Sequence, residues 1–269
     1  MRPLGLVGPL SIDIIEGGPP QPGGAPFHAA RALRMLARPA VVITRCAAED
    51  RSKLVPPLVA LGLPVTCLNG DRTSTFAFRY EGDIRHFEIV SVGDSWTPEE
   101  ARALRRGPLA DVEWLHVGPV LRSDFPAETL AELAAGRRLS FDAQGLVRRP
   151  EPGPLSLDTD YDRQLLEHVS ILKLAEEEAI AAVGSLEPDA LAELGPPEIL
   201  VTFGSRGALL VADGKAEQIK AHPVAGDPTG AGDAFSAGYL ASRAAGLAPV
   251  AATRAATALV GTMPTTQNR

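Results

Sequence analysis

The most informative stretch of this chain is Asp227-Pro228-Thr229-Gly230-Ala231-Gly232-Asp233, where a glycine-rich turn leads into an Ala-rich segment. We expect a long helix from about Ala231 to Ala245. Gly230 and Gly232 let the backbone approach a ligand closely, because neither residue has a Cβ atom. The start of a helix presents unpaired N–H groups and partial positive charge. The stretch therefore predicts a site for a phosphate, or for the charge that grows on a transferring phosphoryl group.

Asp233 lies beside this predicted anion site, in the first turn of the expected helix. A carboxylate does not bind phosphate directly, so its chemical task there is to orient a hydroxyl nucleophile and accept its proton. The alternative is structural, since Asp-Pro-Thr-Gly is also a turn sequence and an acidic residue complements the helix dipole.

Extended through Ala234-Phe235, the stretch resembles the C-terminal signature of the PfkB (ribokinase-like) carbohydrate kinases. The resemblance implies that Asp233 is the catalytic base. It also implies that the backbone amides of Gly230, Ala231 and Gly232 form the anion hole for the phosphoryl group. The implied fold is a three-layer α/β structure, with a mostly parallel central sheet, helices on both faces and a small β lid.

A second family-like segment near the N-terminus implies a site for the phosphoryl acceptor. An apolar run is followed by Asp13 and then by Gly23-Gly24-Ala25-Pro26-Phe27-His28. We expect Asp13 to accept hydrogen bonds from two neighbouring sugar hydroxyls, and Gly23 and Gly24 to let backbone amides come close to the ring. The family usually carries Asn where His28 stands, and the resemblance makes His28 an acceptor contact. Taken alone, the segment favours the structural alternative of a turn residue, a loop and a helix-start histidine, and its pairing with the distal signature favours acceptor binding.

The segment Ile171–Ala179 resembles the region where the family carries an Asn and, three residues later, a Glu that organises Mg²⁺ near the nucleotide phosphates. Glu178 matches the Glu and is expected to act on Mg²⁺ through water, whereas Ala175 stands at the Asn position. Losing that ligand should weaken but not abolish the site, because phosphates and water hold most of the ion. A charged helix start at Glu176–Glu178 is the alternative.

The segment Leu200–Ala208 resembles the strand and Gly-x-x-Gly turn that lie beside the nucleotide in the family. Together with the two segments above, it implies a set of ATP contacts, namely Lys173, Thr202, Gly204, Gly207 and Thr229. Asp227 is a candidate ligand for a monovalent cation, as in some relatives.

The segment Phe141–Arg148 occupies the place where family members have a strand-end Asp, a variable stretch and an Arg. Its Gln144-Gly145 followed by Arg148 resembles the inositol kinase branch. Asp142, Gln144 and Arg148 are candidates to reach the acceptor or the phosphates, and we expect Gln144 and Arg148 to contact the acceptor. A surface loop is the alternative, and the Pro-rich sequence that follows predicts such a loop.

Elsewhere, strand and helix patterns alternate, which predicts a mostly parallel sheet covered on both faces. The expected strands are Leu4–Leu10, Ala40–Thr44, Pro64–Leu68, Glu113–Gly118, Leu139–Asp142, Ile171–Leu174 and Glu198–Phe203. The other expected helices are Ala25–Ala37, Ala48–Leu61, Pro98–Arg105, Ala127–Ala134, Tyr161–His168 and Ala248–Gly261.

One segment departs from this alternation. Thr73–Tyr80 and Ile84–Val92 alternate with period two around a Glu-Gly-Asp turn, which predicts an antiparallel hairpin. It lies where the family has its lid, so we expect one ribokinase-like domain over residues 1–269 with a lid at about 70–93 and a contribution from 11–22. Lid closure would exclude water and limit wasteful ATP hydrolysis, whereas a plain edge hairpin is the alternative. A homodimer formed through the lid is left open.

Composition excludes several other classes of protein. The 269 residues are 45% hydrophobic, enough for one large α/β domain, and the formal net charge of −7 argues against nucleic acid as a partner. No stretch approaches the length of a membrane span, so we expect no membrane partner and a cytoplasmic location. The P-loop, dinucleotide, zinc-protease and nucleophile-elbow motifs are absent, and Cys46 and Cys67 have no metal spacing and are expected to be two buried thiols.

These patterns predict an ATP-dependent kinase that uses Mg²⁺ to phosphorylate a hydroxyl of a small sugar or polyol, an inositol-like compound included. A nucleoside kinase is one alternative, although the 5% aromatic content offers little to stack a purine. A kinase-like protein that binds a sugar or nucleotide without turnover is another, and Asp233 argues against it.

Overall fold

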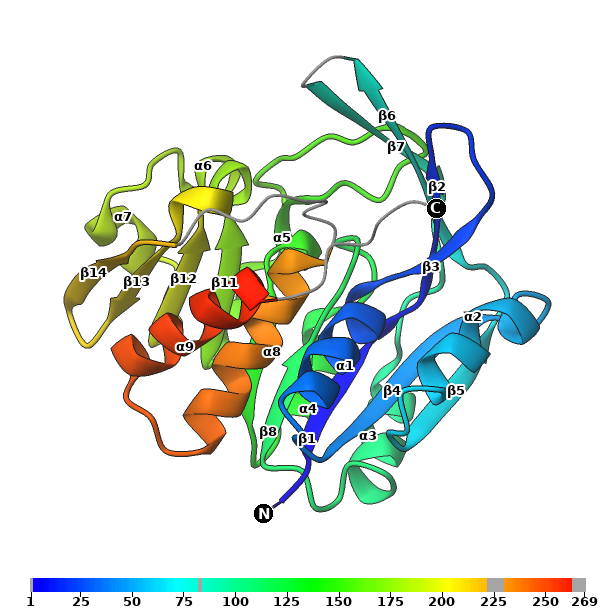
Figure 1. Cartoon of the computed structure of the whole chain (residues 1–269), viewed down its shortest axis with the longest axis horizontal. Coiled ribbons are helices and arrows are strands. Elements are labelled where there is room, and N and C mark those ends of the chain that lie inside the picture. The colour runs from blue at the N-terminus through cyan, green and yellow to red at the C-terminus, as the bar shows by residue number, and fades with distance from the viewer. Residues whose placement is uncertain (1, 82–83, 222–229, 263–269) are drawn as a thin grey trace.

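The computed structural model describes residues 2–81, 84–221 and 230–262, and its main feature is a nine-stranded sheet (Figure 1). In spatial order, its strands are β14 (Lys215–Ile219), β13 (Ala208–Ala212), β12 (Glu198–Thr202), β11 (Ile171–Ala175), β9 (Arg138–Asp142), β8 (Trp114–Val117), β1 (Leu4–Pro9), β4 (Ala40–Ala47) and β5 (Val65–Gly70). The strands from β12 to β5 are parallel, and β13 and β14 are antiparallel additions at one edge.

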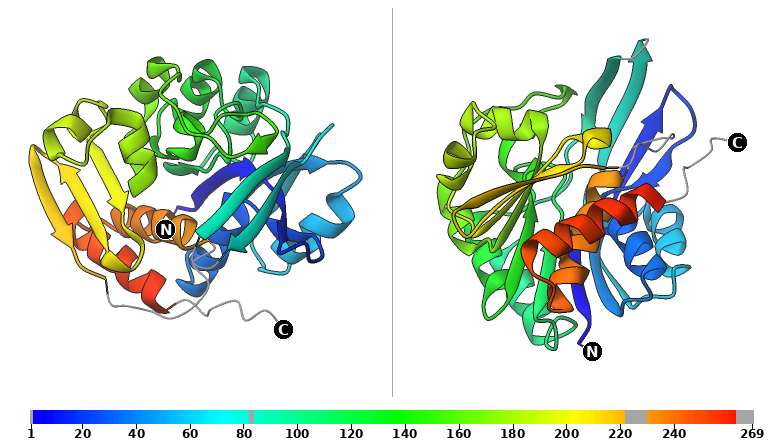
Figure 2. Two further views of the ribbon diagram at one scale, coloured as in Figure 1. Left: turned by 90° about the horizontal axis from the view of Figure 1, so that it is seen from above. Right: turned by 60° about the vertical axis from the view of Figure 1, so that its left-hand side comes forward.

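Helices cover both faces of this sheet, as Figure 2 shows from two sides. One face packs against α1 (Ala25–Met35), α2 (Arg51–Val59), α8 (Ala231–Ala244) and α9 (Pro249–Thr262). The other packs against α3 (Pro98–Arg106), α4 (Ala127–Ala134), α6 (Glu176–Val183), α7 (Pro188–Ala192) and the 3₁₀ helix η1 (Arg163–His168). Each face has its own cluster of buried apolar side chains. The three-layer α/β fold expected from the sequence is confirmed.

The central strands are mostly apolar because both of their faces are covered. Every residue of β1 is buried, and the same holds for nearly all of β4. The helix α8 is built from small residues, and eight consecutive residues from Ala234 to Ala241 are buried. Small side chains on α8 allow α1 and α9 to pack close to it, and a Cβ atom at Gly238 would lie 2.8 Å from Leu259.

A second sheet of five strands, called the small sheet below, stands above one edge of the large one (Figure 1). Its order is β10 (Gly153–Pro154), β7 (Ile84–Ser91), β6 (Ser74–Glu81), β2 (Ser11–Ile15) and β3 (Gln21–Gly23). Strands β6 and β7 form the antiparallel pair that the alternating sequence predicts. Phe76, Phe78 and Ile89 are buried against Val120 and Leu121, so the two phenylalanines belong to the core of the small sheet.

The structure differs from the sequence expectations in several elements. The first apolar run ends as a strand at Pro9, and the chain continues as β2 in the small sheet. The expected helix Tyr161–His168 is instead the 3₁₀ helix η1, a tighter turn that places the consecutive Leu165 and Leu166 in the core. The strands β13 and β14 and the short helices α5 (Gln144–Val147) and α7 were not expected. Cys46 is buried but Cys67 only half so.

Candidate active site

The predicted site residues gather where the parallel strands of the large sheet end. Because β9, β11 and β12 are parallel, their carboxyl ends lie at one edge, and Asp142, Ala175 and Thr202 are the last residues of these strands. Ligands of open α/β sheets bind at this edge. The strand order therefore brings together segments that are far apart in the sequence.

The start of α8 is open to a ligand. Gly230 is its N-cap residue, has a φ of 79°, and no side chain of the described residues caps the first turn. A Cβ atom on Gly230 would lie only 2.4 Å from Nδ1 of His28, so glycine is needed both for the left-handed conformation and for the close approach of α1. Among residues 2–81, 84–221 and 230–262, no side chain occupies the amides of Gly230, Ala231 and Gly232, which suits an anion beside His28.

Lys173 brings a positive charge to the same place. A Cβ atom on Gly232 would lie 3.0 Å from its Nζ atom, and Nζ is 3.2 Å from Oδ2 of Asp142. Burial alone would lower the pKa of Lys173, but the carboxylates of Asp142, Glu178 and Asp233 outweigh it and raise the pKa. The ammonium group therefore stays protonated at the first turn of α8.

Asp233 has the properties of a base. Its Oδ1 atom is buried and accepts no hydrogen bond within the part of the chain that the structure describes, although the residue as a whole is partly exposed. Burial, and next the negative charge of Asp142, raise the pKa of Asp233 to about 7, against the opposing effect of Lys173 and Arg148. A carboxylate with this pKa accepts a proton readily near neutral pH.

The expected acceptor residues lie on the small sheet and at the start of α1. Asp13 is buried, and Oγ of Ser11 donates a hydrogen bond to its Oδ1 at 2.9 Å. A Cβ atom on Gly23 would lie 2.3 Å from Oδ2 of Asp13, so only glycine leaves room for this carboxylate. Gly24 follows as the N-cap residue of α1, with a φ of 97°. The negative charge of Asp13 also contributes to the raised pKa of Asp233, so the predicted acceptor residue and the predicted base lie near each other.

Glu178 and Arg148 form a further part of this site. Glu178 is 2% exposed, and its Oε2 accepts a hydrogen bond from the backbone N–H of Ala175 at 2.8 Å. Nη2 of Arg148 lies 3.4 Å from Oε1 of Glu178, and the guanidinium lies over the ring of Phe87, 5.4 Å from its centroid. Arg148 is therefore not a surface-loop residue, whereas Glu178 is a buried member of the charged first turn of α6.

The residues present fit Mg²⁺ if the phosphates of the donor and water supply most of its ligands. Among the described residues, no group of three or more His, Cys, Asp or Glu side chains forms a metal cage. Instead of a cage, the described residues offer the negative charges of Glu178 and of Asp142, whose buried Oδ2 is paired with Lys173. This is the usual manner of Mg²⁺ binding beside phosphates.

The remaining predicted residues lie beside this cluster or outside the described part. Oγ1 of Thr202 donates to the carbonyl of Leu174 at 3.2 Å. After β12, Gly204 begins the 3₁₀ turn η2 (Gly204–Arg206) and Gly207 is its C-cap residue. The backbone N–H of Gln144 donates to Oδ1 of Asp142 at 3.1 Å. Asp227 and Thr229 lie outside the described residues.

Sequence reasoning missed two contacts of this site. Asp142 is predicted as a strand-end carboxylate in reach of the acceptor or the phosphates, but its pairing with Lys173 depends on the adjacency of β9 and β11. For Phe87, the only signal in the sequence is the strand alternation. This predicts the face of the sheet on which the residue lies but not the residue that it contacts.

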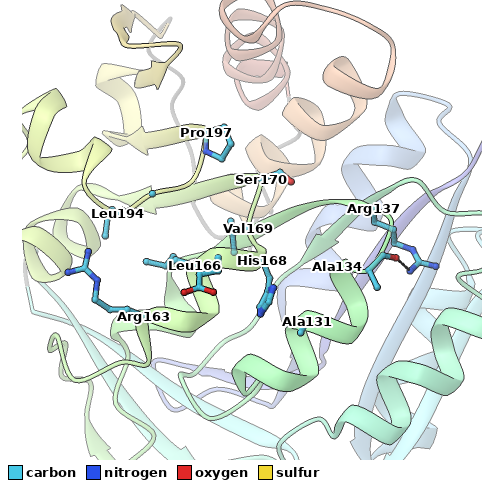
Figure 3. Close-up of a pocket in the computed structure, with 13 residues that line it drawn as sticks. Ala131, Ala134, Arg137, Arg163, Leu166, His168, Val169, Ser170, Leu194 and Pro197 are labelled. Carbon is cyan, nitrogen blue, oxygen red and sulfur yellow. Dashed lines mark hydrogen bonds between the residues drawn. The ribbon is translucent and has the colours of Figure 1, made fainter.

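A cavity of about 620 Å³ lies away from these residues (Figure 3). It is lined by Ser170 and Pro197, which precede β11 and β12, and so lies toward the amino ends of these strands. Arg137 faces it, but its guanidinium is engaged by the carbonyls of Val112 and Leu109. Its lining includes none of the predicted site residues, so we do not assign the active site to it. Among the described helices, none has both the length and the apolar character that crossing a membrane requires.

Comparisons with known proteins agree with this geometry. A fructokinase from Salmonella thompson is 34% identical over 190 residues, which cover 65% of this chain and 77% of that protein. A fructokinase from Salmonella typhimurium has the same identity over 190 residues, which cover only 56% of its length.

Solved structures resemble this chain in fold over nearly its whole length. A pyrophosphate-dependent kinase in the ribokinase family, complexed with a pyrophosphate analog and myo-inositol, has a TM-score of 0.82 at 25% identity, covering 96% of this chain and 93% of that one. Arabidopsis thaliana ribokinase, complexed with ribose and ATP, shares the fold with a TM-score of 0.74 at 22% identity, covering 97% and 91%. Residues 21–265 match the model of the pfkB family of carbohydrate kinases. This chain therefore belongs to the pfkB carbohydrate kinase family.

Proposed function

We propose that this protein transfers a phosphoryl group from ATP to a hydroxyl of a small polyol or sugar, with a cyclic polyol of the inositol class as the first candidate. The observation that carries the proposal is the placement of Asp233. Its buried Oδ1, which has no hydrogen-bond partner among the described residues, lies at the start of α8, near Lys173 on the anion side and near Asp13 on the acceptor side.

In the proposed reaction, Asp233 takes the proton of the acceptor hydroxyl as its oxygen attacks the terminal phosphorus of the donor. The bond from that phosphorus to the bridging oxygen breaks, and ADP leaves. The first-turn amides of α8 and the ammonium of Lys173 stabilise the negative charge on the transferring group. Mg²⁺, when bound with the donor, neutralises phosphate charge, and Glu178 would hold its water ligands.

The choice of acceptor is supported by the polar groups opposite Asp233. Asp13 offers a carboxylate to paired hydroxyls, and Arg148 and Gln144 follow β9 on the other side of the site. The pyrophosphate-dependent kinase that is 25% identical to this chain was solved with myo-inositol, and the curated relatives are fructokinases. Myo-inositol and fructose are therefore the first acceptors to test.

Pyrophosphate is a second candidate donor, favoured by that same 25% identical kinase. Lys173 and the helix amides recognise phosphate groups, and this recognition does not by itself require a nucleoside. ATP remains our first candidate because the Gly204–Gly207 turn resembles the nucleotide turn of the family.

We also propose that the small sheet is a lid that closes over the acceptor, within one domain spanning residues 1–269. The roles of Asp227 in monovalent cation binding and of Thr229 at the nucleotide remain parts of this proposal, as does pairing of two lids in a homodimer.

Turnover tests the proposal directly. Each donor is incubated with Mg²⁺ and with myo-inositol, fructose, ribose or adenosine, and product is followed as ADP or phosphate. The variant D233N should lower kcat by roughly two to four orders of magnitude and leave acceptor binding largely intact. Full activity in D233N would refute the role of Asp233. Thermal stabilisation by acceptors without any product from either donor would favour a binding protein instead.

A further inference from the structure

Arg148 links the small sheet to the donor side of the candidate site. It follows α5, its side chain is only 17% exposed, and its guanidinium lies between Phe87 of β7 and Glu178 of α6. The backbone of Arg148 is fixed, since its N–H donates to the carbonyl of Gln144 at 3.2 Å and its carbonyl accepts from the N–H of Arg122 at 3.1 Å. Only the side chain is therefore available to change partners.

The guanidinium makes little use of its hydrogen-bonding capacity in this position. Its Nη2 atom lies 3.4 Å from Oε1 of Glu178, well beyond the roughly 2.7–2.9 Å of a strong charged hydrogen bond. Its Nε atom is buried without a partner among the described residues. A guanidinium has five N–H donors, so a polyol with several hydroxyl oxygens would be a better partner than the distant carboxylate.

A move of Arg148 toward the acceptor would change the charge at Glu178. Glu178 is buried, and its Oε1 has the guanidinium of Arg148 at 3.4 Å. Burial raises the pKa of Glu178, while the positive charge of Lys173 and, less strongly, that of Arg148 oppose this effect. At such short range in a buried site, withdrawal of one of two positive charges alters the interaction with a hydrated cation. With Lys173 as its remaining positive neighbour, Glu178 would attract the Mg²⁺ that accompanies the donor more strongly.

We propose, on the basis of the proposed function, that Arg148 is a positioning residue that couples acceptor binding to donor binding. Without acceptor it pairs with Glu178 and weakens binding of the Mg²⁺-donor complex. With acceptor bound, it turns to the acceptor hydroxyls and releases Glu178. Because such coupling is reciprocal, the donor complex strengthens acceptor binding by the same factor. The arrangement limits donor hydrolysis when no acceptor is present.

The test is calorimetric binding of two non-hydrolysable donor analogues with Mg²⁺, AMP-PNP and methylenediphosphonate, in the absence of acceptor. The variant R148Q should bind one of them about threefold to tenfold more tightly than the wild type, because Glu178 has lost one of its two competing cations and keeps only Lys173. R148K, which keeps the charge, should bind as the wild type does. The matched control R149Q removes the neighbouring exposed arginine, which pairs with Glu151, and should change nothing.

Two further measurements keep the result decisive. Saturating myo-inositol should tighten analogue binding to the wild type about tenfold but should have little effect on R148Q. In an E178Q background, R148Q should no longer strengthen binding. If R148Q binds the analogues as weakly as the wild type, or more weakly, the proposed coupling is overturned. If R148Q does not fold, the wild type decides, and the coupling is overturned when myo-inositol leaves its analogue binding unchanged. Failure of the wild type to bind either analogue would overturn the proposed function itself.

Discussion

At the scale of single residues, the pKa of Asp233 sets the pH dependence of the proposed reaction. Burial, and then the charge of Asp142, raise this pKa to about 7, so a large fraction of the free enzyme carries a protonated base at neutral pH. We expect kcat/KM to rise about tenfold per pH unit below pH 7 and to level off above it, since it reports the free enzyme. Initial rates at subsaturating acceptor between pH 5 and 9 measure this. A flat profile over this range would contradict a base with this pKa.

The same raised pKa predicts a cost in stability. In the unfolded chain the Asp233 carboxyl group titrates near the ordinary aspartate value of 3.8, so between that value and about 7 the folded protein holds a proton that the unfolded chain has released. Stability from this group is therefore present at low pH and lost as the pH rises through this window. D233N should melt several degrees above the wild type at pH 8 and show little difference near pH 4. Equal melting temperatures at pH 8 would show that the carboxylate is not buried in solution.

Gly230 gives a second prediction at this scale. Alanine there adopts the left-handed conformation at a cost of about 1–2 kcal/mol, and its Cβ atom also collides with the ring of His28. G230A should lower both melting temperature and kcat. Adding H28A should restore part of the stability by removing the collision, while the backbone cost remains. No recovery in the double variant would show that His28 does not press on Gly230.

Single residues also show what the sequence could reveal about the site. Asp233 and Asp13 stand in local motifs, so their positions could be predicted without knowledge of contacts. The ion pair of Lys173 with Asp142 depends on β11 lying next to β9, and no local pattern encodes that neighbour. The contact of Arg148 with Phe87 likewise depends on how the small sheet sits above α5.

At the scale of elements, the strands β13 and β14 are joined by a hairpin sequence that our sequence analysis does not use. Ala208–Ala212 is a short apolar run, and Asp213-Gly214 then joins it to Lys215–Ile219. Asp-Gly is a strong hairpin signal because both turn residues take positive φ, here 51° and 67°. The hairpin was therefore predictable from local sequence. The 3₁₀ geometry of η1 was less so, because a six-residue segment offers too little periodicity to distinguish two helix types.

The small sheet gives a prediction about its proposed action as a lid. Phe76 is 3% exposed and packs with Ile89 against Leu121, so F76A removes a large part of the contact between this sheet and the body. We expect F76A to raise the acceptor KM severalfold and to increase ADP formation in the absence of acceptor, because water reaches the donor. The control V90A alters a side chain of β7 that is 49% exposed and should leave both quantities unchanged. Unchanged hydrolysis in a folded F76A would argue against a lid.

At the scale of the whole molecule, the alternation of strands and helices predicted the layers because each βα unit must bury an apolar face. The spatial order could not be obtained from that pattern. The first strand of the chain, β1, lies inside the sheet between β8 and β4, and the small sheet draws strands from three separate segments. The active site arises from this order, since it brings β2, β9, β11 and α8 together.

The contacts at the start of β12 and the C-terminal end of α8 lie at the opposite ends of these elements from the candidate active site. We therefore expect a substitution there to lower the melting temperature without lowering turnover. At the start of β12, Glu198 accepts hydrogen bonds from Oη of Tyr239 at 2.5 Å and from Nη2 of Arg243 at 2.6 Å, near the C-terminal end of α8. Removing its charge leaves Arg243 largely buried and unpaired, which typically costs about 3–5 kcal/mol. The melting temperature of E198Q should therefore fall by on the order of 10 °C.

Turnover of E198Q at 25 °C should nevertheless stay within about twofold of the wild type, since the buried residues Ala234–Ala241 separate Arg243 from the first turn of α8 and hold the helix in the core. The matched control is E217Q, which breaks the exposed pair of Glu217 with Arg254 and should cost less than about 1 kcal/mol. If E198Q lost activity in proportion to its stability while remaining folded, α8 would have to move as a rigid body. The anion hole would then depend on contacts at both ends of the helix and not on its first turn alone.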